Sequence, residues 1–383
     1  MQNFSFFASC PRGLEQVLTA ELTALGALQL VPTDGGVVFA GPWSLLMKAN
    51  LQSRIASRIL WKLEERPYVR EDDLYRLALK IDWPALFSVD NTIKVGVTAV
   101  KSPLRSTNLA ALKVKDAICD RFRQAGGTRP SVDTQEPDMR IQLFLTDRMA
   151  TIYLDTSGEA LFKRGYRVEA VDAPLRENLA AGILALSGWQ ASEPLYDPMC
   201  GSGTFLIEAV LKARNIAPGS RRTFAFQYLR QHDEKAWQAL RDEARNAERH
   251  DQALQISGSD VSSTALMHAQ ANLLAAKLDG VVSLKQLNML DAKAPAVEGV
   301  LLTNPPYGIR LDEQDKLLAA YPEWGNVLKQ RFAGWRAYFF TADPALAKAI
   351  RLKPSKKTPL FNGALECRLL EFKMIAGGNR GHD

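Results

Sequence analysis

Asp197-Pro198-Met199-Cys200-Gly201-Ser202-Gly203-Thr204 stands between a short apolar strand and a predicted helix over Phe205–Lys212. Gly201 and Gly203 allow a tight turn and a close approach of a ligand to the backbone at the helix start. The stretch lacks the third glycine of the dinucleotide fingerprint and the Gly-Lys-Ser/Thr of a phosphate-binding loop. Because Asp197 would repel a diphosphate, the stretch favours a ligand with a cationic or amine group.

Around this stretch, from about residue 170 onward, helices alternate with apolar strands, which predicts a parallel α/β sheet. The predicted strands are Leu195–Asp197, Ile256–Asp260, Val281–Leu284, Val300–Leu302 and Ala337–Thr341, with a closing antiparallel pair over Ala364–Ile375. A charged, predicted helical segment, 217–253, interrupts this pattern and contains Trp237. It either caps the edge of the sheet or lines the approach of a substrate, and the first interpretation is preferred.

Polar side chains follow four of these strands in order: Asp197, Asp260, Asp291 and Asn304. The carboxyl ends of parallel strands meet at one edge of a sheet, so these residues trace a single crevice. A single aspartate more often caps a helix or forms a turn, and only the ordered series argues for a site. Asp260 can accept both hydroxyls of a ribose, and Asp291 can accept from an adenine amine. With Asp197 at an amino-acid end, the series predicts S-adenosylmethionine as the cofactor.

Asn304-Pro305-Pro306-Tyr307 follows the apolar run Gly299–Thr303. Neither proline has an N–H to donate, so the chain must leave the sheet in an extended shape. Asn304 and the Pro305 carbonyl can accept the two hydrogens of a planar amine, while Tyr307 stacks on its ring. Asn304, Pro305, Pro306 and Tyr307 are therefore the candidate catalytic residues. A proline-rich turn that starts a helix is the alternative for the tetrapeptide alone.

Composition limits the other classes of function. The chain of 383 residues exceeds one ordinary domain, so two or three are expected. Its apolar stretches are too short for a membrane span, and four scattered cysteines with four scattered histidines predict neither a disulfide framework nor a metal site. A reducing cytoplasm fits this cysteine usage.

The net charge of +6 is concentrated in one segment. Residues 94–129 contain eight basic side chains and two acidic ones, a balance that suits a polyanion such as RNA. The candidate RNA-binding residues are Lys101, Arg105, Lys113, Lys115, Arg121 and Arg123. A solvated helix face is the alternative for one short cluster.

The first 155 residues read as small α+β modules. Residues 1 to about 60 are predicted to form strand, helix, strand and helix. Strands are expected over Ile93–Val100, Arg140–Leu145 and Ala150–Leu154, with a helix over Leu109–Arg123 that turns Leu112, Ala117 and Ile118 to the core. Residues 155–167 are predicted to form a connecting hairpin.

Two further stretches resemble a known family. Lys163–Arg167 and Ala173–Ala181 are similar to the segment that leads into the catalytic domain of the THUMP-containing RNA guanine-N2 methyltransferases. Phe7–Glu15 is similar to the start of that family. Asp197–Glu208 and residues 304–307 look like the first motif and the catalytic motif of class I, Rossmann-like methyltransferases that act on exocyclic amino nitrogens. The resemblance covers essentially the whole chain.

The resemblance implies a Rossmann-like α/β methyltransferase domain preceded by small α+β ferredoxin-like and THUMP modules. The implied boundaries are 1–60 for the ferredoxin-like module, 61–155 for the THUMP RNA-binding module, 156–170 for a linker hairpin, 171–376 for the S-adenosylmethionine-dependent domain and 377–383 for a disordered tail. In the family, the leading segment lies against the methionine part of the cofactor. The implied cofactor-binding residues are Pro174, Glu177, Asn178, Asp197, Met199, Gly201, Gly203, Asp260, Asp291 and Asn304, with no metal.

The resemblance also implies a reaction and a partner. Within the family the chain looks most like the RlmL type, which implies methyl transfer to N2 of a guanine in 23S rRNA or a pre-ribosomal large-subunit particle. In enterobacterial relatives an RlmK-type methyltransferase half follows. The chain is therefore expected to be a stand-alone form beside a separate RlmK-type protein, or a piece that lacks this C-terminal half.

Four alternatives stay open. A tRNA guanine-N2 methyltransferase would share the same architecture, because THUMP modules commonly accompany tRNA enzymes. DNA adenine-N6 and protein glutamine-N5 methyltransferases share the motif at 304–307, although neither typically carries a THUMP-like module. A non-catalytic RNA-binding or ribosome-assembly factor could use the fold as a scaffold, but the intact Asp197, Gly201, Gly203 and Asn304 argue against it.

Overall fold

The structure is a computed structural model that describes residues 3–168, 175–306 and 311–375, with the side chains of residues 311–316 left out. The chain divides into two compact units, which are described separately. Unit 1 comprises residues up to Cys10, Leu18–Leu161 and Gly219–Ala244. Unit 2 comprises Pro11–Val17, Phe162–Pro218 and Arg245 onward.

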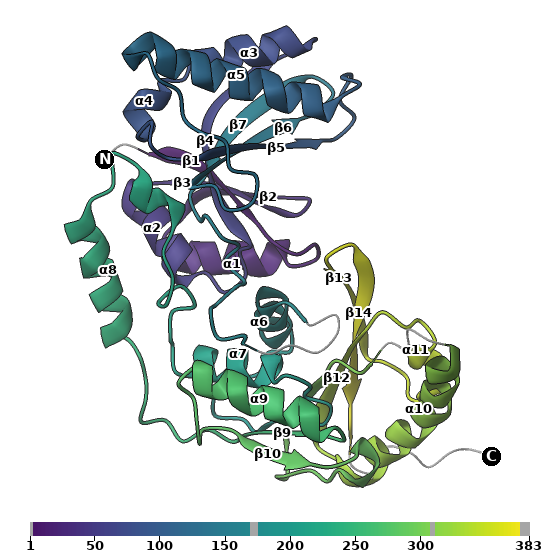
Figure 1. Ribbon diagram of the computed structural model, residues 1–383. Helices are drawn as coiled ribbons and strands as arrows, with labels where there is room; N and C mark the ends of the chain where they lie inside the picture. The colour runs from purple at the N-terminus through teal and green to yellow at the C-terminus, as the bar shows by residue number, and fades with distance from the viewer. Residues whose placement is uncertain (1–2, 169–174, 307–310, 376–383) are drawn as a thin grey trace. The chain divides into compact units, whose positions relative to one another are not determined.

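Unit 1 is built on one seven-stranded sheet in the order β2-β3-β1-β4-β7-β6-β5 (Figure 1). Its strands are β1 (Phe4–Ser9), β2 (Leu28–Thr33), β3 (Gly36–Gly41), β4 (Arg58–Pro67), β5 (Ile93–Ala99), β6 (Met139–Leu145) and β7 (Met149–Asp155). The β5 and β6 strands are parallel, while the other neighbours are antiparallel. Long β4 pairs with β1 at one end and with β7 along its length, so it joins the sheets of the first and second modules.

The helices among the first 155 residues are α1 (Glu15–Leu25), α2 (Trp43–Gln52), α3 (Glu71–Leu79), α4 (Trp83–Leu86) and α5 (Thr107–Gly126). Helix α5 begins where the Ser106 hydroxyl accepts a hydrogen bond from the Leu109 amide and ends at left-handed Gly127. Its buried face consists of Ala110, Val114, Ala117, Ile118, Cys119 and Phe122. The expectation that Leu112 faces the core is wrong, because this side chain is 52% exposed on the opposite face of the helix.

Two further expectations for the first 168 residues need correction. The predicted order of strand, helix, strand and helix missed β2, which forms a hairpin with β3 across the turn at Asp34 and Gly35. Residues 156–168 form no strand pair in the described part of this segment, so the predicted linker hairpin is wrong. Irregular backbone at 156–160 is held instead by side chains, because Arg222 donates to the carbonyls of Ser157 and Ala160.

The segment 217–253 contains a short 3₁₀ turn, η1 (Ala225–Tyr228), and helix α8 (Glu234–Asn246). Phe224, Phe226 and Trp237 pack against one another, with the indole edge-on to both phenyl rings. The Phe226 amide donates to the Thr156 carbonyl, and the Arg230 amide donates to the Leu86 carbonyl. Most of this segment therefore belongs to unit 1, although the chain reaches it from the parallel sheet of unit 2.

Unit 2 contains a second seven-stranded sheet, in the order β10-β9-β8-β11-β12-β14-β13. Its strands are β8 (Leu195–Asp197), β9 (Ile256–Asp260), β10 (Ser283–Gln286), β11 (Gly299–Thr303), β12 (Trp335–Thr341), β13 (Lys356–Asn362) and β14 (Leu365–Lys373). The first five strands pair in parallel, which confirms the predicted parallel sheet. The strand order reverses between β8 and β11, the position where open α/β sheets bind ligands.

Helices cover both faces of this sheet. They are α6 (Glu177–Leu186), α7 (Thr204–Ala213), α9 (Ser263–Ala275), α10 (Leu311–Arg331) and α11 (Leu346–Ala349). Alternation along β12 separates the two layers. Ala337 and Phe339 join an aromatic core with Trp324 of α10, whereas the Tyr338 hydroxyl donates to the Ser187 carbonyl at the end of α6. The sheet is thus buried on both faces, as a parallel sheet requires.

The predicted closing antiparallel pair of strands is present, but its predicted residue range is wrong. Residues 365–373 form a single strand, β14, and its partner β13 lies earlier at Lys356–Asn362. Strand β13 is the edge of the sheet and contains exposed lysines and Pro359, so it lacks the apolar run by which a buried strand is found. None of the helices in the described parts of the chain combines the length and apolar character needed to cross a bilayer.

Candidate functional site

The polar residues predicted to trace a crevice do follow neighbouring strands. Asp197 ends β8 and Asp260 ends β9, while Asp291 lies in the 3₁₀ turn η2 (Met289–Asp291) after β10 and Asn304 follows β11. The sheet order β10-β9-β8-β11 therefore places Asp291, Asp260, Asp197 and Asn304 in a row along one edge. The row crosses the point where the strand order reverses.

The glycine loop between β8 and α7 depends on backbone conformations that glycine provides. Gly201 and Gly203 have φ values of 54° and 80°, in the left-handed region that other residues rarely adopt. A Cβ on Gly203 would also lie 3.2 Å from the Cβ of Ala269 on α9. The loop consequently lies close against a helix and brings the amides at the start of α7 to the edge of the sheet.

Asp260 holds this loop directly. One carboxylate oxygen accepts a hydrogen bond from the Gly201 amide at 2.9 Å, and the other accepts from the Ser262 amide at 2.9 Å. Each oxygen can accept a second bond, so the side chain retains positions for ribose hydroxyls. Asp260 therefore supports the loop in addition to the role predicted from the sequence.

Asp197 is buried, and its carboxylate accepts the Met199 amide at 3.1 Å. Burial raises the pKa of Asp197 to about 7, the Thr303 hydroxyl and the Met199 amide oppose that rise, and the negative charge of Asp260 adds to it. A buried carboxylate with a raised pKa at a ligand-binding edge gains from a cationic partner. An amino-acid ammonium group would serve as that partner.

The segment that leads into α6 is fixed to the start of α7. The guanidinium of Arg167 donates to Glu177 at 2.8 Å, to the Leu175 carbonyl at 2.8 Å and to the Thr204 hydroxyl at 3.1 Å. Glu177 and Asn178, both predicted to bind the cofactor, are buried at the first positions of α6. Arg167 thus joins Glu177 to the helix that follows the glycine loop.

The remaining predicted site residues differ in their solvent exposure, and two of them lie outside the described residues. Asn304 is half-buried, Pro305 is buried and Pro306 is exposed directly after β11, while Asp291 is exposed. Met199 is half-buried in the turn before the glycines. Pro174 and Tyr307 lie outside the described residues, so their predicted roles stay predictions.

Two residues, Asn272 and Arg167, have positioning roles that the sequence analysis did not assign. Buried Asn272 of α9 donates from its amide to the Ser202 carbonyl at 3.1 Å and accepts from the Val168 amide at 2.9 Å. It thereby connects the glycine loop with the segment before α6. Asn272 has no sequence signal for this role, because its partners Val168 and Ser202 lie 104 and 70 residues away. Arg167 ends the stretch Lys163–Arg167 quoted in the sequence analysis, but no role was assigned to it there.

Four of the six predicted RNA-binding residues are neutralised by acids. Lys113 and Arg121 pair with Asp72 and Asp82, at 2.7 Å and 3.1 Å, across separate elements of unit 1. Lys115 and Arg123 pair with acids on their own helix. Lys101 and Arg105 are exposed in the loop before α5, and neither forms an ion pair with any described residue. This loop therefore holds the two predicted RNA-binding residues whose charge no described acid neutralises.

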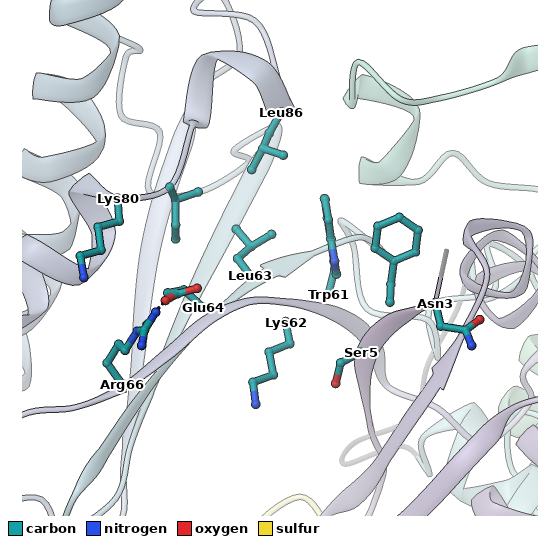
Figure 2. Close-up of a pocket in the computed structure, with 11 residues that line it drawn as sticks. Asn3, Ser5, Trp61, Lys62, Leu63, Glu64, Arg66, Lys80 and Leu86 are labelled. Carbon is teal, nitrogen blue, oxygen red and sulfur yellow. Dashed lines mark hydrogen bonds and ion pairs between the residues drawn. The ribbon is translucent and has the colours of Figure 1, made fainter. Parts of the chain in front are cut away.

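Unit 1 also contains a pocket of about 650 Å³ where β1 and β4 separate beyond the pair Phe6–Trp61. Its lining residues are Asn3, Phe4, Ser5, Trp61, Lys62, Leu63, Glu64, Arg66, Lys80, Ile81 and Leu86. Figure 2 shows Lys80, Arg66 and Glu64 toward one end and Trp61 with Asn3 toward the other. The cations Arg66 and Lys62 are paired with Glu64 and Glu65, and the sequence analysis did not single out these residues.

Comparisons with known proteins bear on the same regions. Family models match residues 164–371 as an RMKL-like methyltransferase domain, 68–155 as a THUMP domain and 5–60 as an RlmL ferredoxin-like domain. The chain is 40% identical over 370 residues to the "Putative RNA methyltransferase slr0064" of Synechocystis, covering 96% of each protein. The chain belongs to the RlmKL-like methyltransferase family. The predicted ferredoxin-like, THUMP and Rossmann-like methyltransferase folds are thereby confirmed.

Members of this family differ in length. The chain is 43% identical to the ribosomal RNA large subunit methyltransferase K/L of Aeromonas hydrophila, over 96% of the chain and 54% of that protein. The chain therefore spans about half the length of that relative. The crystal structure of SMU.472, "a putative methyltransferase complexed with SAH", superposes with a TM-score of 0.89 and 33% identity over the full length of both chains. The protein therefore has the fold of an S-adenosylmethionine-dependent methyltransferase.

Proposed function

We propose that the protein transfers a methyl group from S-adenosylmethionine to the exocyclic N2 of a guanine in 23S rRNA, in the cytoplasm. The observation that carries this proposal is the position of Asn304 and Pro305 directly after β11, beside Asp197 at the reversal of strand order. The relatives named as large-subunit ribosomal RNA methyltransferases and the THUMP match support RNA as the substrate. The RlmL ferredoxin-like match supports the guanine-N2 half of that family.

The cofactor would be held by residues from three strand ends. Asp197 would accept its ammonium group, Asp260 its ribose hydroxyls and Asp291 its adenine amine, with Met199, Gly201 and Gly203 lining the loop. Glu177, Asn178 and Pro174 would lie against the methionine part. When bound, the cofactor supplies a methyl group on an electrophilic sulfonium.

Asn304 and Pro305 would prepare the nucleophile. The lone pair of a guanine N2 amine is conjugated with the ring, which makes it a weak nucleophile. Acceptance of both amine hydrogens, by the Asn304 amide oxygen and the Pro305 carbonyl, would turn that lone pair toward the methyl carbon. Positioning of this kind can supply much of a methyl-transfer rate, and the proton can leave after the methyl arrives. A paired guanine would first have to be extruded from its helix.

The first test identifies both the substrate and the role of Asn304. The protein is incubated with methyl-labelled cofactor and, in separate reactions, unmethylated 23S rRNA, tRNA and DNA, and the modified nucleosides are identified. The label is expected in N2-methylguanosine from 23S rRNA. Asn304→Ala is expected to lower transfer at least about 100-fold, as losses of positioned polar groups commonly do, with nearly unchanged affinity for the cofactor.

Asn246→Ala, at an exposed position of helix α8, provides the matched control and should keep full activity. Label in tRNA would redirect the proposal to a tRNA enzyme, and label in N6-methyladenine would refute guanine as the target. Loss of cofactor binding in Asn304→Ala, with normal single-turnover transfer once saturated, would contradict the role given to this residue.

A further inference from the structure

A pocket of about 220 Å³ lies at the carboxyl end of β12, the strand next to β11. Its lining residues are Thr341, Ala342, Asp343, Pro344, Ala347, Glu366, Cys367, Arg368 and Leu370. Parallel pairing aligns Thr303 with Phe339, and antiparallel pairing aligns Thr341 with Arg368. The pocket therefore opens at the same edge of the sheet as Asn304. Pockets for drug-sized ligands are larger, so this one suits a group the size of a single base.

Asp343 is held in place at this pocket. One carboxylate oxygen accepts the hydroxyl of buried Tyr321 at 2.6 Å, and the other accepts the Ala345 amide at 2.7 Å. The Asp343 amide in turn donates to the Thr341 hydroxyl at 2.9 Å. A carboxylate oxygen has two acceptor positions, so each oxygen of Asp343 keeps one for a ligand. The side chain is a fixed acceptor on one wall of the pocket.

Arg368 provides donors on another wall. Its guanidinium lies 3.6 Å from Glu366, with both side chains more than half exposed, so this ion pair binds it weakly. A guanidinium has five N–H donors, and a single distant carboxylate leaves most of them available. The pocket thus combines a fixed acceptor with a cationic donor.

We infer that Asp343 and Arg368 read the Watson–Crick edge of the target guanine. This inference rests on the proposed function and names two residues that select the base for the same site. Asp343 accepts the N1–H of guanine, and Arg368 donates to O6. The neighbouring N2 amine is left to Asn304 and the Pro305 carbonyl.

Asp343 also rejects adenine. An adenine that offered its N6 amine to Asn304 would place the N1 lone pair, an acceptor, where guanine has a donor. The Asp343 carboxylate would then face that lone pair with no hydrogen between them. Leaving a half-buried carboxylate opposite an acceptor costs binding, as with any unmatched polar group.

Strand geometry agrees with this arrangement. Neighbouring strands lie about 5 Å apart and rise about 3.3 Å per residue, so Asp343 lies on the order of 10 Å from Asn304 along the edge. Two side chains that hydrogen-bond adjacent atoms on one edge of a base can span that separation. The base would then lie beside the strand-end crevice proposed for the cofactor.

The test compares guanosine with 2-aminopurine in the short RNA that carries the guanosine methylated by the wild-type protein. 2-Aminopurine keeps the N2 amine, but its N1 carries no hydrogen and it has no O6. The wild-type protein is expected to prefer guanosine by about 30- to 100-fold in kcat/KM, as loss of a hydrogen bond to a charged group predicts. In Asp343→Asn, the new amide can donate to N1 of 2-aminopurine, so the preference is expected to fall at least about tenfold. Loss of the Arg368 partner O6 is common to both proteins and cancels in the comparison.

Asp279→Asn is the matched control, because Asp279 bonds Gln270 before β10 and lies toward the opposite end of that strand. It should keep the wild-type preference. Melting temperature and affinity for S-adenosylhomocysteine are expected to stay unchanged in both variants. Fluorescence of the RNA-borne 2-aminopurine gives a binding readout that does not require turnover, and Asp343→Asn should bind this RNA more tightly than the wild type does.

The outcomes separate the two proposals. A relaxed preference with tighter 2-aminopurine binding in Asp343→Asn supports the inference. If guanosine is methylated but Asp343→Asn keeps the wild-type preference, the role of Asp343 is refuted and the proposed function stands. Methyl transfer to a base other than guanine refutes both.

Discussion

At the scale of single residues, the Asp197 carboxylate is placed to bind a cation but is costly to ionise when no ligand is bound. Its position at the end of β8 suits an ammonium group, but burial makes the bare carboxylate costly to ionise. The folded pKa of about 7 lies above the ordinary aspartate value of 3.8, so folding favours the protonated form. The stabilisation from that proton is fully present below about pH 4 and is lost as the pH rises through about 7.

Asp197→Asn should therefore flatten the pH dependence of ligand-free stability. The free energy of unfolding of the wild type is expected to fall between pH 5 and pH 8 by on the order of 1–4 kcal/mol more than that of the variant. Urea denaturation at the two pH values measures both differences. Parallel pH profiles for the two proteins would show that Asp197 does not titrate in this range.

At the scale of elements, a buried network ties the segment before α6 to helix α7. Glu208 of α7 lies 3.5 Å from the Arg164 guanidinium, with both side chains almost fully buried, and accepts the Tyr166 hydroxyl at 3.0 Å. Replacing Glu208 would remove a buried carboxylate from beside the buried Arg164 guanidinium. The network thus makes the docking of this segment sensitive to one side chain.

Glu208→Ala is expected to lower the free energy of unfolding by about 3–5 kcal/mol, the usual effect of breaking a buried ion pair from one side. Asp147→Ala offers the comparison, since Asp147 and its partner Arg148 are both mostly exposed and the loss should cost less than about 1 kcal/mol. Chemical denaturation measures both. Equal losses in the two variants would mean that burial of the Glu208 pair adds nothing.

The elements also show what the sequence could predict. Parallel strands were found because apolar runs such as Val300–Leu302 are buried on both faces, and polar strand ends follow them directly. Strand β13 was missed because it is an exposed edge, and Leu112 was misplaced because it lies five residues before Ala117, off the buried face of α5. A local sequence pattern predicts helices and strands whose apolar residues recur with a regular period. Edge strands and side-chain contacts depend on residues that are distant in the sequence, so a local pattern does not predict them.

At the scale of the whole molecule, the same limit applies to charge. The window 94–129 contains two acids, yet Asp72 and Asp82 from outside it neutralise Lys113 and Arg121 in the folded protein. Counting charges along the chain therefore overestimated the charge available to RNA. Lys101 and Arg105, which pair with no described acid, become the stronger candidates.

Two double variants of equal charge change test this distinction. Lys101→Gln with Arg105→Gln is expected to reduce the slope of log affinity against log salt by about 1.5, the value for two lost phosphate contacts. Lys113→Gln with Arg121→Gln should reduce it by less than half as much. Titration of 23S rRNA fragments over a range of salt measures the slopes, and a reversed order would restore the helix face as the RNA contact.

The assignment of Gly219–Ala244 to unit 1 and of Pro11–Val17 to unit 2 limits how recombination can rearrange the gene. The chain passes between the units five times, at residues 10/11, 17/18, 161/162, 218/219 and 244/245. Neither unit is encoded by one continuous stretch of the gene. A single cut in the gene therefore cannot separate the coding sequence of one whole unit from that of the other. Recombination can append a further domain to such a chain, but it cannot exchange the RNA-binding half for another without rebuilding the catalytic half.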